Sequence, residues 1–185
     1  MAQALLVIDV QKDLVEGNGG EVPIFEPERL FEAIGKAVEQ AEQAGARIVF
    51  VRDKSVGGGE GEGFDVHPAL RIPPDAAVFD KTATSSFHET GLLEHLREHG
   101  VRHCVIAGCM TQYCIDTAVR AATLHGFDVT LVRDGHSTSD SPVLSAEQII
   151  AHHNATLHGY DNNGPFALVR PTEEALFDPP HDQYR

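Results

Sequence analysis

The sequence predicts an α/β fold, a three-layer α/β/α sandwich around a Rossmann-like parallel sheet of about six strands. Two observations support this prediction. Short apolar runs with little strict alternation, typical of strands buried on both faces, recur along the chain. Amphipathic segments lie between these runs, and such alternation of strand and helix indicates parallel strands joined by right-handed crossovers.

The predicted strands are apolar runs that are too short to form helices. They cover residues 4–8, 47–51, 77–79, 103–107, 129–132 and 166–169.

The first predicted helix begins at Pro27, where proline suits the first helical turn, and carries apolar residues at helical spacing as far as Ala41. Gly45 is expected to end it. A second, short helix is expected after Thr90, whose hydroxyl can cap it, and before Gly100.

A third helix is expected to begin at Thr111 as its cap and to end at Gly126. Ser145 and Gln148 have the spacing of a capping box, which predicts a fourth helix that stops near Gly159.

Two segments depart from this pattern. Residues 57–63 are rich in glycine, too flexible and polar to pack, and are interpreted either as a surface loop or as a mobile wall or lid of a pocket. The tail, residues 178–185, is expected to be irregular. No linker divides the chain, so residues 1–185 are predicted to form a single domain, as their number suits.

The composition excludes several classes of partner. Against 14 Lys+Arg stand 28 Asp+Glu, and the formal net charge of −14 disfavours binding to nucleic acid or to an anionic membrane. No apolar run approaches the ~20 residues of a membrane-spanning helix, and the N-terminus lacks the basic region of a signal peptide. Three cysteines, an odd number, indicate reduced thiols. We therefore expect a cytoplasmic protein.

Three reactive side chains follow predicted strands. Asp9 follows the first strand, Lys81 the third and Cys114 the fourth. Singly, each has an ordinary explanation as a turn residue, a solvated cation or a small core residue. Because ligands of open parallel sheets bind beyond the carboxyl ends of the strands, their joint placement predicts a reactive site.

Cys114 is the candidate nucleophile. If Thr111 caps the third helix, Cys114 lies in the first helical turn, where the helix dipole favours the thiolate, and a nearby Lys81 would lower the thiol pKa further. Asp9 could accept the thiol proton and return it to a leaving amine. The backbone N–H groups of Met110 and Cys114 are placed to receive a developing oxyanion.

Three motifs resemble the isochorismatase-like cysteine hydrolases, a family that includes nicotinamidase and N-carbamoylsarcosine amidase. They are LLVIDVQ at residues 5–11, the segment from Asp80 to Phe87, and VIAGCMTQYCIDTA at residues 105–118. The resemblance extends from Leu5 to about Val169, nearly the whole chain.

The resemblance implies roles for individual residues. Asp9, Lys81 and Cys114 match the family's catalytic triad, and the Cys109–Met110 bond matches its non-proline cis peptide, which turns the Met110 N–H toward the oxyanion. Gln11 matches a pocket-side position. Further residues flank the same loops and are expected to line the substrate pocket: Phe87, His88, Tyr113 and His136.

One departure from the family bears on cofactors. Nicotinamidases carry metal-binding histidines that begin with Asp-x-His after the second strand, whereas here Asp53 is followed by Lys54 and Ser55. His67 is the only histidine of that loop, and one imidazole with Asp53 makes a poor zinc site. We predict no metal, and the absence of a glycine-rich phosphate loop predicts no nucleotide cofactor.

The expected function is hydrolysis of a C–N bond, in an amide or carbamoyl group of a small molecule, through a thioester on Cys114. Family resemblance also implies a homodimer or higher homo-oligomer. Isochorismatase-type cleavage of a vinyl ether, with Cys114 a bystander, is one alternative, although some true isochorismatases lack this cysteine. The other alternative is a non-catalytic binding module on the same fold.

Overall fold

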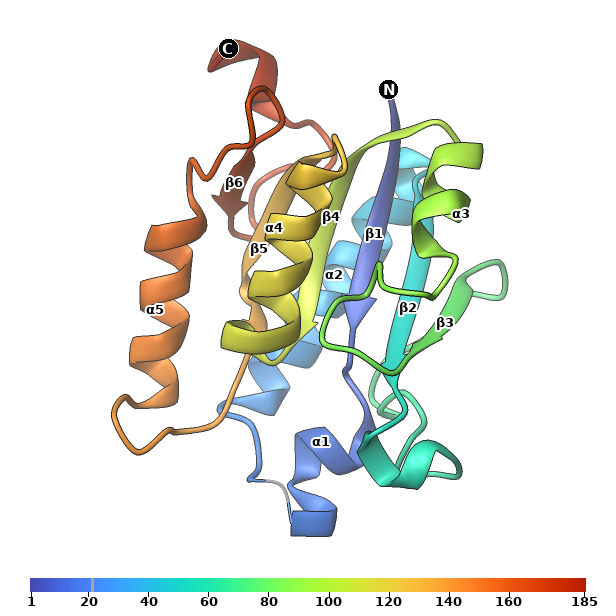
Figure 1. Ribbon diagram of the computed structural model, residues 1–185, viewed down its shortest axis with the longest axis vertical. Coiled ribbons are helices and arrows are strands. Elements are labelled where there is room, and N and C mark those ends of the chain that lie inside the picture. Colours follow the sequence, from blue (N-terminus) through green and yellow to red (C-terminus); the bar gives the residue numbers. More distant parts are fainter. Residues whose placement is uncertain (21) are drawn as a thin grey trace.

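The structure, a computed structural model, describes residues 1–20 and 22–185. All six strands of its one sheet run parallel, in the order β3-β2-β1-β4-β5-β6 (Figure 1). The strands are β1 (Ala2–Ile8), β2 (Arg47–Asp53), β3 (Ala77–Lys81), β4 (Val101–Cys109), β5 (Asp128–Ser137) and β6 (Ala167–Arg170). The α-helices are α1 (Lys12–Glu16), α2 (Pro27–Ala44), α3 (Leu92–Glu98), α4 (Asp116–Leu124) and α5 (Ala146–Leu157).

Helices cover both faces of the sheet, as predicted. Helix α2 lies behind the sheet in Figure 1, while α3, α4 and α5 lie in front of it. Strand β1 shows why both faces are apolar: Leu5 and Val7 pack in the core layer that includes Ile34 of α2. Leu6 and Ile8 pack in the opposite layer, beside α3 and α4. The three-layer α/β/α architecture is therefore confirmed.

The helix signals in the sequence are largely confirmed. Helix α2 begins at Pro27, and Gly45 follows its last residue in the left-handed conformation. The capping box of Ser145 and Gln148 is present at the start of α5. Thr90 accepts a hydrogen bond from the N–H of Leu92 at 3.2 Å. The N-cap position of α3 is nevertheless Gly91.

Two segments that we expected to be irregular are packed. The glycine-rich segment contains a 3₁₀ turn over Val56–Gly59 with Val56 buried, and the carbonyl of Gly63 accepts a hydrogen bond of 3.0 Å from the N–H of Asp13 in α1. Helix α1 itself was not predicted. In the tail, Pro180–Gln183 form another 3₁₀ turn, and the buried His181 ring hydrogen-bonds the Val129 carbonyl at 2.9 Å. Contacts to neighbouring segments hold both in place, and local composition cannot predict such contacts.

The chain order places a crevice at the centre of the sheet. From β1 the chain adds β2 and then β3 on one side of β1, and it later adds β4, β5 and β6 on the other side. The connections that follow β1 and β4 therefore run toward opposite ends of the sheet. Ligands of such sheets bind at this switch point, beyond the carboxyl ends of the strands. Among the described residues, no helix is both long and apolar enough to cross a membrane.

Gly108 of β4 fixes the close approach of β4 to β1. Its φ is +128°, and a Cβ there would lie 2.0 Å from the carbonyl oxygen of Ile8. We predict that Gly108→Ala lowers the free energy of unfolding by at least about 3 kcal/mol, measured by urea unfolding, because the new methyl group must push the two strands apart.

Gly35→Ala in α2 is the matched control, because Gly35 has open space around it. That change is expected to stabilise the protein by up to about 1 kcal/mol through helix propensity. Equal stabilities for the two variants would contradict the role of Gly108.

Candidate active site

Four neighbouring strands each deliver one side chain to the switch point. Lys81 is the last residue of β3, Asp53 the last of β2, and Asp9 directly follows β1. Cys114 lies in the turn after β4. Since these strands are adjacent in the order β3-β2-β1-β4, side chains far apart in the sequence meet along one edge of the sheet.

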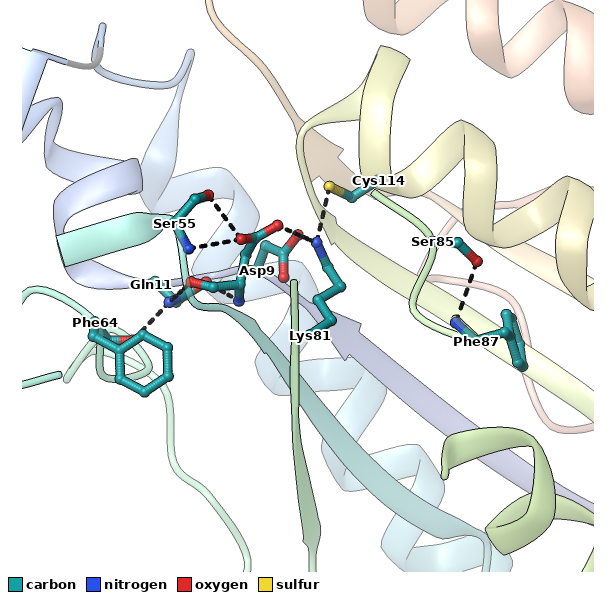
Figure 2. A network of polar contacts seen from close by, with 9 residues as sticks. Asp9, Gln11, Ser55, Phe64, Lys81, Ser85, Phe87 and Cys114 are labelled. Atoms are coloured by element: carbon teal, nitrogen blue, oxygen red, sulfur yellow. Dashed lines mark hydrogen bonds and ion pairs between the residues drawn. The ribbon is translucent and has the colours of Figure 1, made fainter. Parts of the chain in front are cut away.

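The Lys81 ammonium lies at the centre of this group. Its Nζ is 2.9 Å from Oδ2 of Asp9, 2.5 Å from Oδ2 of Asp53 and 3.4 Å from Sγ of Cys114. Figure 2 shows the Lys81 ammonium between Cys114 and Asp9. The Lys81 side chain has no solvent exposure. Burial opposes its charge, but the charge of Asp9 and the hydrogen bond to Asp53 outweigh burial and raise the pKa of Lys81.

Asp9 is a buried carboxylate with spare acceptor capacity. Its backbone turns sharply after β1, with φ at +52°, and its N–H donates to the Val51 carbonyl at 2.8 Å. Neither carboxylate oxygen of Asp9 accepts a well-aligned hydrogen bond from the described residues, so its contact with Lys81 is an ion pair. Burial raises the pKa of Asp9 to about 6, against the opposing charge of Lys81.

The chain presents Cys114 differently from the prediction. Residues Thr111–Ile115 form a π-helical turn ahead of α4, and the capping position belongs to Met110, which makes no side-chain cap. Thr111 therefore does not cap the helix, because its hydroxyl instead pairs with Nδ1 of His136 at 2.9 Å.

The expected thiolate is also corrected. Burial, followed by the negative charge of Asp9, raises the pKa of the Cys114 thiol to about 12, and Lys81 only partly offsets them. This raised pKa favours the neutral thiol over the thiolate at rest. The sulfur and the carboxylate oxygens of Asp9 and Asp53 lie within 4.8 Å of one another, so the thiol proton has an acceptor at hand.

The two residues predicted to supply the oxyanion donors, Met110 and Cys114, line the same cavity. The Cys109–Met110 peptide bond is cis. Outside the regular helices and strands of the described chain, no hydrogen bond uses the N–H of Met110.

A cavity of about 190 Å³ opens onto the sulfur. Its polar lining comes from Asp9, Asp53, Ser55, Tyr113 and Cys114. Leu14, Val56 and Met110 supply its apolar lining. Tyr113, expected at the pocket, is on this wall and is 54% exposed. Val56 directly precedes the glycine-rich segment, and no residue of 57–63 is part of the lining.

Gln11 lies behind the cavity, not in it. The side chain is fully buried, and its Oε1 accepts the N–H of Asp53 at 2.7 Å. Its Nε2 donates to the carbonyls of Asp53 at 3.0 Å and Phe64 at 2.8 Å (Figure 2). Both N–H groups of the amide are used and the side chain is fully buried, so Gln11 fixes the end of β2 and does not offer a group to substrate.

Three other predicted pocket residues lie outside this cavity. Phe87 is buried in the core and stacks with Phe127 at a centroid distance of 6.4 Å. The His88 side chain is 60% exposed and faces Glu89. His136 is fully buried, where its Nε2 contacts the Asn154 amide oxygen at 3.0 Å and thereby links α5 to the turn that carries Cys114. Sequence position near a loop did not reveal which way these rings point.

The residues do not fit a zinc site. Asp9, Asp53 and Cys114 place potential ligand atoms close together, but the Lys81 ammonium already contacts all three. His67 stacks on Phe31 with ring centroids 4.4 Å apart and lies outside the cavity lining. The prediction that no metal binds stays a prediction.

A parallel α/β fold with a thiol, a carboxylate and an ammonium at its switch point carries the groups that nucleophilic hydrolysis needs. The chain belongs to the isochorismatase family, because the model of the isochorismatase domain matches residues 3–156. This membership confirms the family expected from the motifs, and the family is hydrolytic.

Individual relatives agree with this assignment. The chain is 30% identical to the isochorismatase family protein YddQ of Bacillus subtilis (strain 168), covering 95% of this chain and 99% of that protein. It is 30% identical to a streptothricin hydrolase of Streptomyces noursei, over 76% of this chain and 56% of the relative. The crystal structure of an isochorismatase family protein, 27% identical, superposes with a TM-score of 0.81 over 91% of this chain and 97% of its own.

The Gln11 side chain generates a test of how Asp53 is held. We predict that Gln11→Leu lowers the free energy of unfolding by about 2 kcal/mol, because it leaves buried backbone groups without partners. Hydrogen exchange of the Asp53 amide is expected to become faster, since Gln11 is its acceptor.

Gln40→Leu is the matched control, because Gln40 also bridges two backbone groups, those of Thr172 and Leu176, away from the cavity. It should cost stability without changing exchange at Asp53. Unchanged exchange at Asp53 in Gln11→Leu would show that Gln11 does not hold that residue.

Proposed function

We propose that the protein is a cysteine-dependent hydrolase that cleaves a C–N bond, in an amide or carbamoyl group, through a thioester. The observation that carries the proposal is the convergence of Asp9, Lys81 and Cys114 at one cavity, with Lys81 Nζ 2.9 Å from Asp9 and 3.4 Å from Cys114. The family's relatives include amidohydrolases, among them streptothricin hydrolase and nicotinamidases, which favours amide over ether cleavage.

Asp9 acts as the base in the first half of the reaction. Its raised pKa, about 6, leaves it ionised at neutral pH yet basic enough to take a proton. It removes the Cys114 thiol proton as the sulfur attacks the substrate carbonyl. Because the thiol pKa is high, this proton moves together with the attack and no resting thiolate is needed.

The tetrahedral intermediate places negative charge on the former carbonyl oxygen. In this proposal the N–H groups of Met110 and Cys114 donate to that oxygen. Protonated Asp9 then gives its proton to the departing nitrogen, the C–N bond breaks and a thioester remains. Asp9 next deprotonates a water molecule that attacks the thioester, which releases the acid and restores the thiol.

Lys81 holds this arrangement throughout. It contacts the base, the nucleophile and Asp53 together, so its positive charge offsets the carboxylates while the proton moves. A cavity of about 190 Å³ suits a small molecule. The expected homo-oligomer and the cytoplasmic location stay predictions.

Capture of the thioester tests the proposal. Screening of primary amides, carbamoyl compounds and cyclic amides is expected to find a substrate, and hydroxylamine added during turnover is expected to yield the hydroxamate. Cys114→Ala should abolish the hydroxamate and lower amide hydrolysis at least about 10³-fold, because the nucleophile is lost.

Cys104→Ala is the matched control, because Cys104 is a buried core thiol and should leave turnover intact. Amide hydrolysis that survives Cys114→Ala would refute the thioester route. Cleavage of isochorismate but of no amide, equally in the parent and Cys114→Ala, would establish the vinyl ether reaction instead.

A further inference from the structure

The cavity wall carries more negative charge than the proposed reaction needs. Two carboxylates, Asp9 and Asp53, line the cavity, and among the described lining residues there is no lysine, arginine or histidine. The one ammonium in contact with them, Lys81, is behind the wall with no solvent exposure. One positive charge therefore faces two negative ones.

Cations on nearby segments do not correct this balance. Arg52 pairs with Asp80 at 2.8 Å and with Asp65 at 3.1 Å. Lys12 lies 3.4 Å from Glu62, outside the cavity. Lys54 is exposed and is not part of the wall. A small molecule that reaches Cys114 thus meets net negative charge.

Asp53 is the carboxylate that the proposed mechanism does not use. Asp9 suffices as acid and base, whereas Asp53 has no step of its own in the mechanism. Its Oδ2 contacts Lys81, its Oδ1 accepts from both the N–H and the hydroxyl of Ser55, and its backbone is held by Gln11. These bonds hold the carboxylate ionised, with a lowered pKa, and fix its position beside the sulfur.

We infer that Asp53 is a specificity-determining residue that selects neutral or cationic substrates and excludes those with a carboxylate near the reacting carbonyl. The inference deepens the proposed function and rests on it for the identity of the reaction. Like charges brought together in a poorly solvated cavity repel strongly, so an anionic substrate must bring its charge against both Asp9 and Asp53. Dianionic isochorismate falls in the excluded class.

Two alkylating reagents of nearly equal size test this inference. Iodoacetamide is neutral and iodoacetate is anionic, and both transfer a carbon to the same sulfur with loss of iodide. Peptide mass spectrometry gives the rate at Cys114 for each reagent at pH 8 and low salt, and the ratio of the rates is compared with that of free 2-mercaptoethanol. A change in the thiol pKa alters the thiolate available to both reagents equally and cancels in the ratio.

The parent protein is expected to disfavour iodoacetate more than the free thiol does. Asp53→Asn should shift the ratio toward iodoacetate about tenfold, the effect of one nearby charge in a partly desolvated site. Asp65→Asn is the matched control, since it removes a charge from the neighbouring loop outside the cavity, and should leave the ratio within about twofold.

An unchanged ratio in Asp53→Asn, or the same change in Asp65→Asn, would overturn the inference. A parent protein that disfavours iodoacetate no more than free 2-mercaptoethanol does would also overturn it, because the cavity would then exert no selection against an anion. The measurement needs no amide substrate, so a failed search for amidase activity remains distinguishable from a failure of this inference.

Discussion

The buried ammonium of Lys81 is the constraint on which the site depends. A charged group without solvent exposure must be paired, because an unpaired buried charge costs several kcal/mol. Lys81 reaches from β3 to Asp53 on β2 and to Asp9 after β1, and it also contacts Cys114 after β4. Removal of any one of these partners therefore changes how Lys81 pairs with the other two. The same pairing keeps Asp9 ionised in a place where burial alone would favour its neutral form.

The fold was predictable from the sequence because its signals are local. The apolar runs buried on two faces and the helix start at Pro27 depend only on neighbours in the chain. The structure has a six-strand parallel sheet and α2 where these patterns placed them. The edge of the sheet at which Asp9, Lys81 and Cys114 gather was also predictable, because parallel strands end together. Packing between distant segments was not predictable in this way: the glycine-rich segment is ordered by α1, and the tail by contacts to β5.

The finer structure of the site escaped prediction for a similar reason. The extra residue of the π-helical turn at Thr111–Ile115 leaves no signal in helical periodicity, and it moves Cys114 out of the expected first α-helical turn. The motif indicated that Gln11 matters but not that its amide faces the backbone of Asp53. Asp53 was considered only as a metal ligand, and its spacing to Lys81 across adjacent parallel strands, paired in register, could have revealed the ion pair.

The most direct test of this account is the titration of the Asp9 carboxyl by ¹³C NMR, assigned by comparison with Asp9→Asn. The account predicts a midpoint near pH 6, because burial outweighs the attraction of Lys81. It also predicts a higher midpoint in Lys81→Met, because loss of the ammonium removes the main charge that stabilises the carboxylate. A midpoint near the ordinary aspartate value of about 4, unaffected by Lys81→Met, would contradict it.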